Sequence, residues 1–361
     1  MRRTTRSSPS TSTRGWDDPA MSRTTSVVSV SPALRAEFFT PAAWETLTAL
    51  TDVVLVDDPA TLGATLDART GAAPSGLSRA QVLVISWGTP RLDAALLDRL
   101  PGLRLVAHTG ASVKPFVTPE LFARGVRVTQ AGQGMAQSVG EVSVVFAMAL
   151  LHQLPRFHHG LASGASWEDA EDAPPRFEIA GTRVGVIGAS RTGRAAITML
   201  RALGAEVVVA DPTLSATDAQ ALGVTLLSLD DLLATSRITM LHAPTLPETH
   251  HLVGARELAL MPDGAGLVNT ARSWLTDEEA LLREVASGRI DAALDVFDAE
   301  PLPVDHPLRT LPNVLLTPHH AAATVQGRLR QGSIVVEEIA RFLAGDPLQH
   351  EVDEAALTQM G

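Results

Sequence analysis

Short runs rich in valine and leucine alternate with longer amphipathic segments along most of this chain. Runs that are apolar at nearly every position are typical of strands buried on both faces, and a helix must cross over between two parallel strands. In the second half of the chain there are six such runs: RVGVIG, AEVVVAD, RITMLHAP, AGLVNTA, IDAALDV and NVLLTPH. They predict a parallel sheet of six strands with helices on both faces.

The first half of the chain repeats this pattern with VVSV, DVVLVD, QVLVIS and LRLVAH and ends near GVRVTQA. A chain of 361 residues is too long for one ordinary core and about right for two α/β domains. The apolar stretch 137–154 predicts a linking helix, followed by a turn-rich loop. Residues 324–345 have helical apolar spacing and are expected to pack back on the first domain. The predicted fold is α/β, with two Rossmann-like doubly wound parallel-sheet domains: a discontinuous one, 25–133 with 325–361, and a second, 134–324.

Composition excludes several kinds of partner. Hydrophobic residues make up 45% of the chain and charged residues 19%, which is enough apolar surface for a globular protein. The net charge of −11 leaves no basic patch, so nucleic acid and anionic membrane surfaces are not expected as partners. The nearest approach to a membrane span, Val144–Leu151, is far shorter than the roughly 18 apolar residues required. The chain has no cysteine, which excludes disulfides and thiolate sites and fits a cytoplasmic location.

The first residues read as an extension rather than part of a domain. The opening MRRTTRSSPSTSTRG is basic and rich in serine and threonine, but no apolar region of signal-peptide length follows it. Residues 1–24 are therefore predicted to be disordered. Met21, just before the first strand-like run, is an alternative start of translation.

A turn of the phosphate-binding kind follows the first strand of the second series. Gly188 and Gly193 match the first and third glycines of the G-x-G-x-x-G pattern, which allow a tight turn and close packing of helix on strand. Ser190 replaces the second glycine and brings a side chain to the place where a pyrophosphate approaches the helix N-terminus. Its hydroxyl could itself donate to a phosphate. Arg191 and Thr192 complete the predicted cofactor loop.

Asp211 stands at the end of the next strand, 18 residues after Gly193. A carboxylate there accepts hydrogen bonds from a ribose diol and repels a 2′-phosphate, so NAD is expected rather than NADP. The ordinary alternative is a helix-capping aspartate after a glycine-containing turn.

Three further residues follow later strands of the series, at the edge where parallel sheets bind ligands. Arg272 can hold a carboxylate with two hydrogen bonds. His319 can take and return the proton of a hydroxyl group, and Glu300 can orient the imidazole and favour its charged form. Taken singly, each has an ordinary alternative. Arg272 could form a surface ion pair, His319 could be a turn residue and Glu300 a solvated loop residue.

From about Gly181 to Thr324 the chain resembles the D-isomer-specific 2-hydroxyacid dehydrogenases. The segments that carry the resemblance are LHAPTLPETHHLV, MPDGAGLVNTARSWLTDEEAL and GRIDAALDVFDAEPLPVDHPLRTLPNVLLTPHHAAAT. The resemblance implies that Arg272 binds the substrate carboxylate, that His319 is the acid/base and that Glu300 is its partner. It also implies hydride transfer between NAD and C2 of a small 2-hydroxy or 2-keto acid.

The same resemblance implies further cofactor contacts and an assembly. Asp295 matches a position that contacts the nicotinamide carboxamide, and Ala243, Thr270 and Ala271 match backbone positions that line the cofactor. The discontinuous domain would hold the substrate and residues 134–324 the cofactor, with a cleft that closes between them. A homodimer built on the cofactor domain is expected.

Two departures from the family pattern affect the expected substrate pocket. Ser273-Trp274 follows the catalytic arginine where the family usually has glycine. In the first domain, Gly110, Ala111 and Ser112 begin a changed version of the loop that binds the substrate carboxylate through backbone amides. Lys114, in the same loop, is read as solvated, with a charge for a second acidic group as the alternative.

Other functions remain as alternatives. An NAD(H)-sensing, non-catalytic scaffold or corepressor-like protein is one, although it would not need all three of Arg272, Glu300 and His319. Phosphite dehydrogenase is another, whereas Glu300 argues against formate dehydrogenase, in which glutamine is usual. No metal is expected, because the chain's adjacent histidine pairs tend to diverge from any single ion and no thiolate accompanies them.

Overall fold

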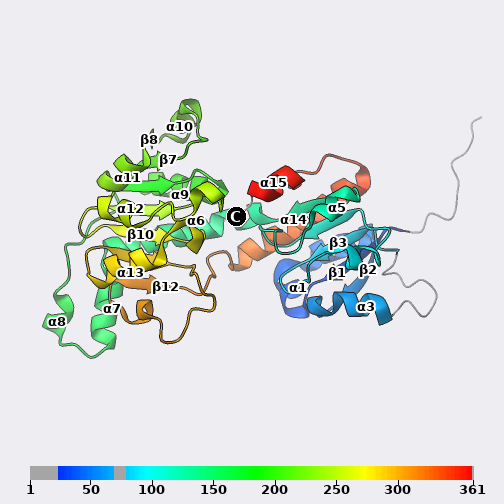
Figure 1. Ribbon diagram of the computed structural model, residues 1–361, viewed down its shortest axis with the longest axis horizontal. Helices are drawn as coiled ribbons and strands as arrows, with labels where there is room; N and C mark the ends of the chain where they lie inside the picture. The colour runs from blue at the N-terminus through cyan, green and yellow to red at the C-terminus, as the bar shows by residue number, and fades with distance from the viewer. Residues whose placement is uncertain (1–22, 69–78, 360–361) are drawn as a thin grey trace, which may run out of the picture.

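The computed structural model describes residues 23–68 and 79–359, which form two lobes joined by a narrow crossing (Figure 1). Most of the predicted disordered extension, including Met21, lies outside the described residues. Each lobe is built on one parallel sheet covered by helices. The predicted fold class, two parallel-sheet α/β domains, is confirmed.

The first sheet has five parallel strands in the order β2-β1-β3-β4-β5. The strands are β1 Thr25–Ser29, β2 Asp52–Val56, β3 Val82–Ile85, β4 Leu105–His108 and β5 Arg127–Gln130. Its helices are α1 Pro32–Phe38, α2 Pro41–Leu50, α3 Leu62–Ala68, α4 Ala94–Leu97 and α5 Pro119–Ala123, with a 3-10 turn η1 Pro59–Thr61. The amphipathic segment after β1 is two helices because Thr40 caps α2 and Pro41 occupies its first turn.

The second sheet has seven parallel strands in the order β12-β11-β10-β9-β6-β7-β8. The strands are β6 Arg183–Ile187, β7 Glu206–Ala210, β8 Thr225–Leu226, β9 Ile238–Leu241, β10 Gly266–Asn269, β11 Asp291–Leu294 and β12 Val314–Leu316. Its helices are α9 Arg191–Ala202, α10 Ala216–Leu222, α11 Leu229–Thr235, α12 Ala255–Leu260 and α13 Glu278–Ala286, with 3-10 turns η4 Pro247–Thr249, η5 Ser273–Leu275 and η6 Pro307–Thr310. The predicted number of six strands was wrong, because the seventh, β8, has only two residues, too few to show a strand pattern in the sequence.

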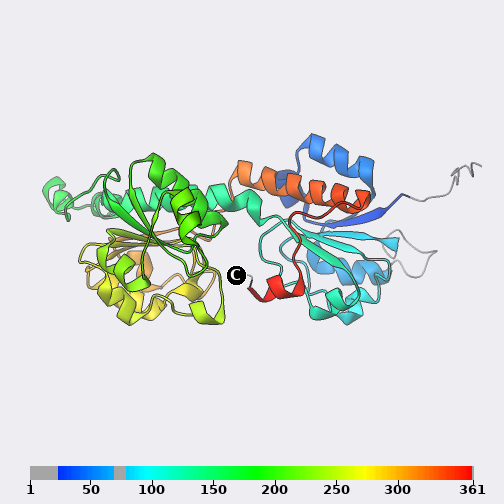
Figure 2. The same cartoon turned by 90° about the horizontal axis from the view of Figure 1, so that it is seen from above.

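Strand order reverses between β6 and β9 in the second sheet and between β1 and β3 in the first. Ligands of such sheets bind at the reversal, outside the carboxyl ends of the strands. Figure 2 shows the two sheets with these ends turned toward one another across the space between the lobes. The topology therefore places two binding edges opposite each other.

Two helices connect the lobes. The 3-10 turn η3 Gly132–Met135 leads into α6 Ala136–Leu151, which packs on α9 and β10 of the second lobe. The return crossing leads into α14 Val325–Ala344, which packs on α1, α2 and β4 of the first lobe. The hydroxyls of Ser138 and Thr324 lie 2.6 Å apart where the crossings meet.

The segment Gly132–Leu151 is long and apolar enough to cross a membrane by length and composition, so the expectation based on Val144–Leu151 alone was too narrow. In the structure 67% of its most apolar window is buried inside the protein. Such burial is typical of a core helix, and here the segment packs between the lobes and against the second sheet.

An arm projects from the second lobe where the sequence predicted only a loop (Figure 1). It consists of α7 Leu154–Ala162 and α8 Trp167–Glu171. Gln153, in the left-handed conformation, turns the chain away from α6. Asp291, at the start of β11, accepts hydrogen bonds from Gln153 and Arg156 and so ties the root of the arm to the sheet.

The end of the chain is fastened to the first lobe by one buried carboxylate. Glu338 of α14 accepts hydrogen bonds from the backbone amides of Gln349 (3.1 Å) and His350 (3.0 Å). The Val352 amide then bonds the Val128 carbonyl on β5, and α15 Glu354–Gln359 follows. Glu338 therefore fixes a segment that covers the edge of the first sheet.

We predict that Glu338→Ala destabilises the first lobe by about 2 kcal/mol, because it removes two charge-assisted hydrogen bonds from a buried site. Thermal unfolding followed by circular dichroism should show a lower melting temperature. The neighbouring exposed Glu337→Ala is the control and should change stability by no more than about 0.5 kcal/mol. Equal melting temperatures for the two variants would contradict the assignment.

Candidate active site

Two adjoining cavities run along the carboxyl edge of the second sheet. One, of about 920 Å³, lies beside Gly188 and Asp211. The other, of about 190 Å³, lies between the lobes. Ser190, Ala243 and Pro244 line both, so the two cavities form one cleft that starts at the strand-order reversal.

The turn after β6 has the shape of a phosphate-binding turn. Gly188 has a φ of +94°, and a Cβ built there would lie 2.6 Å from the Ala243 amide nitrogen. A Cβ at Gly193 would lie 2.1 Å from the Gly188 carbonyl oxygen, so neither glycine can carry a side chain. Ser190 has an ordinary φ of −65° and caps α9, its Oγ accepting from the Gly193 amide at 3.3 Å. The second glycine is thus replaced by a helix cap, which leaves the N-terminus of α9 open to an anion.

Asp211 lies at the end of β7 and lines the larger cavity. One carboxylate oxygen accepts from the amide (2.8 Å) and hydroxyl (2.7 Å) of Thr213, and the other from the Ala189 amide (2.7 Å). Burial by itself would raise the pKa of Asp211, but these hydrogen bonds and the Arg194 charge lower it below its usual value. Ser215, not Asp211, caps the following helix α10. A carboxylate with one acceptor position left therefore faces the cavity, as binding of a ribose diol requires.

His319 and Glu300 form a hydrogen-bonded pair beyond the carboxyl ends of β11 and β12. The Nδ1 of His319 lies 2.7 Å from Oε2 of Glu300, and Oε1 of Glu300 accepts from the Phe297 amide at 3.0 Å. His319 lines the interlobe cavity and also a cavity of about 550 Å³ behind it, which Glu300 lines. Because Nδ1 is engaged by the carboxylate, Nε2 is the ring nitrogen left for a ligand.

The loop that carries His319 is held by hydrogen bonds to the buried carboxylate of Asp295. Oδ1 of Asp295 accepts from the Thr317 hydroxyl (2.5 Å) and the His320 amide (2.9 Å), and Oδ2 accepts from the Ala321 amide (2.9 Å). His319 itself has a φ of +55°, so the backbone needs this support. Asp295 thus positions the histidine and keeps one acceptor position on Oδ2 for another donor in the cavity.

Arg272 is the third residue after the end of β10 and lines the interlobe cavity. The Asn269 side chain donates to the Arg272 carbonyl (2.9 Å) and accepts from the Ala271 amide (3.0 Å), which fixes the backbone of the turn. Within the described residues the guanidinium has no ion pair, and its Nη1 donates to the Ala271 carbonyl. Desolvation lowers its pKa, partly offset by the charge of Glu300. A desolvated, unpaired cation of this kind suits an anionic ligand rather than a surface ion pair.

The structure brings most of the predicted residues to one place. Those that line the interlobe cavity are Ala111, Ser190, Arg191, Thr192, Ala243, Thr270, Ala271, Arg272, Asp295 and His319. Gly110 and Ser112 flank Ala111 but are not in the cavity wall. Sequence reasoning missed Asn269, which is buried at the end of β10, and Thr317, which is half-buried just after β12, although polar residues at strand ends are a signal for both.

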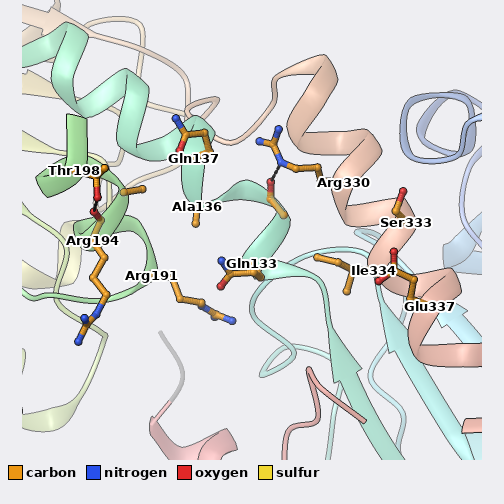
Figure 3. A pocket seen from close by; sticks show the side chains of 12 residues that line it. Gln133, Ala136, Gln137, Arg191, Arg194, Thr198, Arg330, Ser333, Ile334 and Glu337 are labelled. Atoms are coloured by element: carbon orange, nitrogen blue, oxygen red, sulfur yellow. Dashed lines mark hydrogen bonds between the residues drawn. The ribbon is translucent and has the colours of Figure 1, made fainter. Parts of the chain in front are cut away.

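A further cavity of about 660 Å³ opens beside this cleft, between α9 and α14 (Figure 3). Arg191 lines both this cavity and the interlobe cavity. In Figure 3 its side chain extends from the start of α9 toward the Gln133 side, whereas the Arg194 side chain points away. Arg191 is therefore placed to approach an anion at the N-terminus of α9.

Two buried histidines lie close to the cleft. His242, at the strand-order reversal, has no hydrogen-bond partner on either ring nitrogen among the described residues. The Nδ1 of His108 lies 3.3 Å from the Ile85 carbonyl oxygen. Burial lowers the pKa of each to about 4, opposed in His108 by the Ile85 contact. Both are neutral near pH 7 and serve as packing groups.

Comparison with known proteins agrees with this geometry. Residues 144–321 match the family model described as D-isomer specific 2-hydroxyacid dehydrogenase, NAD binding domain. The D-3-phosphoglycerate dehydrogenase of Archaeoglobus fulgidus is 31% identical over 296 residues, covering 81% of this chain and 55% of that protein. The glyoxylate reductase of Aeropyrum pernix is 32% identical over 262 residues, covering 71% of this chain and 78% of that protein.

Among solved structures, D-2-hydroxyisocaproate dehydrogenase has the same fold, with a TM-score of 0.78 at 20% identity, covering 91% of this chain and 99% of that one. The chain spans about half the length of the D-3-phosphoglycerate dehydrogenases it matches, 55% and 53% in two archaeal cases. The matched domain includes all of β6 to β12, and it confirms the predicted cofactor, NAD.

We predict that the free energy of unfolding falls as the pH is lowered from about 6.5 to 4. In this window the unfolded chain protonates His108 and His242 while the folded chain keeps them neutral, so protons favour unfolding. Each histidine steepens the dependence by at most about 1.4 kcal/mol per pH unit. His108→Phe should make this dependence shallower, whereas His158→Ala, on the exposed surface of α7, should not. Urea unfolding at a series of pH values measures both, and identical slopes in His108→Phe and the native chain would refute the assignment.

Proposed function

The chain belongs to the D-isomer specific 2-hydroxyacid dehydrogenase family, and from this we propose that it transfers a hydride between NAD(H) and C2 of a small 2-hydroxy or 2-keto acid. The observation that carries the proposal is the placement of Arg272 and the His319–Glu300 pair on one cavity. One group anchors a carboxylate there while another exchanges a proton.

In the reducing direction, Arg272 holds the keto acid by its carboxylate, with C2 turned toward the second sheet. His319 donates a proton from Nε2 to the C2 oxygen, and Glu300 holds the ring through Nδ1 and stabilises its charged form. Arg272 also offsets the negative charge that develops on that oxygen. NADH, when bound, supplies the hydride to C2, so a ketone, a hydride and a proton give the hydroxy acid.

The residues around the cleft fit this cofactor. The turn from Gly188 to Gly193 and the N-terminus of α9 would hold the pyrophosphate, with Ser190, Arg191 and Thr192 at its rim. Asp211 would accept from the adenosine ribose, and Asp295 would use its remaining acceptor position for the carboxamide. Ala243, Thr270 and Ala271 would line the cofactor. The backbone of the loop Gly110 to Ser112 would meet the substrate carboxylate from the other lobe.

A second candidate function, that of an NAD(H)-sensing scaffold or corepressor-like protein, predicts cofactor binding without turnover. The Asp295 and Asn269 networks speak for an enzyme, because they fix the orientation of His319 and Arg272, which a sensor does not need. Phosphite, as an anion, would also bind Arg272. An activity assay with phosphite and NAD distinguishes this alternative from keto acid reduction.

Self-association as a homodimer is part of the proposal. The arm of α7 and α8 carries exposed apolar side chains, including Leu161 (50% exposed) and Trp167 (66%). Apolar groups on a projecting arm are characteristic of association surfaces. A cytoplasmic location also belongs to the proposal, since the cysteine-free chain needs no oxidising compartment and its reaction needs a pool of free NADH.

We expect NADH oxidation with at least one of glyoxylate, hydroxypyruvate, pyruvate, phenylpyruvate or 2-oxoglutarate, and slower oxidation of NADPH because Asp211 repels the 2′-phosphate.

His319→Ala should lower kcat by about 10²- to 10⁴-fold, the usual contribution of a general acid, and leave the NADH Kd nearly unchanged. Arg272→Lys should raise KM and lower kcat, because an ammonium does not reproduce the planar fork. Loss of NADH absorbance measures turnover, and fluorescence titration measures the Kd for NADH.

Binding of NADH without turnover of any keto acid would support the sensor instead. Full activity of His319→Ala would remove that residue from the chemistry.

For the assembly, we predict that Leu161→Glu converts a dimer to a monomer, because a charge in an apolar interface is left without a partner. Light scattering coupled to size-exclusion chromatography measures the mass. Val304→Glu is the matched control, since Val304 is 90% exposed on the same lobe but outside the arm. A monomeric native chain, or a dimer that survives Leu161→Glu, would argue against the arm as the interface.

A further inference from the structure

A cation that contacts two stacked aromatic rings lies in the first lobe, apart from the residues assigned above. The guanidinium of Arg328 lies 4.7 Å from the ring centre of Trp87 and 5.0 Å from that of Phe38. The two rings are themselves stacked, 5.9 Å apart at 24°. A cation is attracted to the face of an aromatic ring, more strongly when it is desolvated, so the guanidinium is held in one place.

Trp87 stands at the edge of the first sheet that faces the cleft. It is the second residue after β3, and the strand-order reversal of this sheet lies between β1 and β3. Its indole is 44% exposed and contacts His108 edge-on at 6.2 Å. The same His108 packs against Gly110, where a built Cβ would lie 2.6 Å from its Nε2. The next residue, Ala111, lines the interlobe cavity together with Arg272. Through His108, Trp87 therefore lies beside the loop that borders this cavity.

Arg328 lies in the first turn of α14, close to the other side of the same cavity. Ala321 and Ala322, just before this helix, line the cavity with His319. With a rise of about 1.5 Å per residue, Arg328 is only about 5 Å along the axis from the helix start. Its neighbour Arg330 lines the cavity between α9 and α14 and donates to the Gly134 carbonyl (Figure 3).

Arg328 has hydrogen-bond donors to spare. Its side chain is only 16% exposed, and its Nε is buried without a hydrogen-bond partner, with the Glu37 carboxylate 3.5 Å away. Among the described residues neither terminal nitrogen has a partner, although each carries two N–H groups. Holding a guanidinium in a largely desolvated place with only one carboxylate nearby and no hydrogen bond to it is costly. Arg272, which lines the interlobe cavity, is likewise desolvated and has no ion pair among the described residues.

We propose that Arg328, held over Trp87, binds a second anionic group at the far end of the keto acid, so that the substrate is a dianion. This rests on the proposed function, in which Arg272 binds the first carboxylate. The terminal nitrogens of a guanidinium form a planar fork that matches either a carboxylate or a phosphate. A substrate with an uncharged tail leaves that fork unpaired, and sites built for hydrogen bonding discriminate strongly against such analogues.

The test compares two matched pairs of keto acids on the full-length chain with NADH. In each pair only the terminal anion differs: 2-oxoglutarate against 2-oxopentanoate, and phosphohydroxypyruvate against hydroxypyruvate. We expect kcat/KM for one acid with a terminal anion to exceed that of its partner without one by about 10- to 100-fold, the value of charge-assisted hydrogen bonds. Whichever pair shows the larger ratio identifies the terminal group as carboxylate or phosphate.

Arg328→Gln should abolish this preference by raising KM for the acid with the terminal anion, while kcat and KM for the acids with a single carboxylate change little. Arg328→Lys keeps a positive charge over the Trp87 and Phe38 rings but lacks the planar guanidinium, so it should retain part of the preference. It serves as the test if the Arg328→Gln variant does not fold. Arg104→Gln is the control, because Arg104 packs on Phe342 of the same helix at 5.5 Å but precedes β4, at the opposite edge of the sheet. It should leave the preference intact.

Three results would overturn the proposal. Turnover of the acids with a single carboxylate, with no preference for a terminal anion, would reject the second anion while leaving the proposed function standing. An equal loss with all four acids in both Arg328 variants would make the arginine a purely structural residue. No turnover of any keto acid by the native chain would remove the proposed function and, with it, this inference.

Discussion

Two parallel sheets that present their carboxyl ends to one another are the constraint on which the site depends. In each sheet the strand order reverses once, and the chain leaves the reversal through a turn that can carry a polar or charged group. The crossings into α6 and α14 meet at Ser138 and Thr324, so both edges border one cleft. Both lobes line this cleft: Ala111 of the first lobe borders it together with Arg272 and His319 of the second.

Within that cleft, buried polar side chains hold the reactive ones in place. Asp295 uses three of its four acceptor positions to hold the loop of His319, which stands at a positive φ. Asn269 holds the turn of Arg272 in the same way from β10. Because these supports sit on rigid strands, the geometry of the histidine and arginine is set by the sheet rather than by flexible loops.

The sequence predicted the architecture well wherever a strand or helix had enough residues to create a pattern. Six strands of the second sheet were predicted from apolar runs, but the two-residue β8 was not, because its pairing with β7 comes from tertiary contacts. The arm of α7 and α8 was missed for a related reason. Its helices are short, and their apolar side chains face outward, so no buried stripe marks them.

The residues of the candidate site were predicted as separate strand-end residues, and their convergence needed the fold. The pairing of His319 with Glu300 came from resemblance, whereas the support by Asp295 and the capping by Ser190 appear only in the structure. The cations make the same point. The chain carries a net charge of −11, and Arg272 and Arg328 are nevertheless kept largely desolvated without hydrogen-bonded carboxylates. Such placements lower stability unless an anion completes them, and this cost is the physical reason to place an acidic substrate between the two lobes.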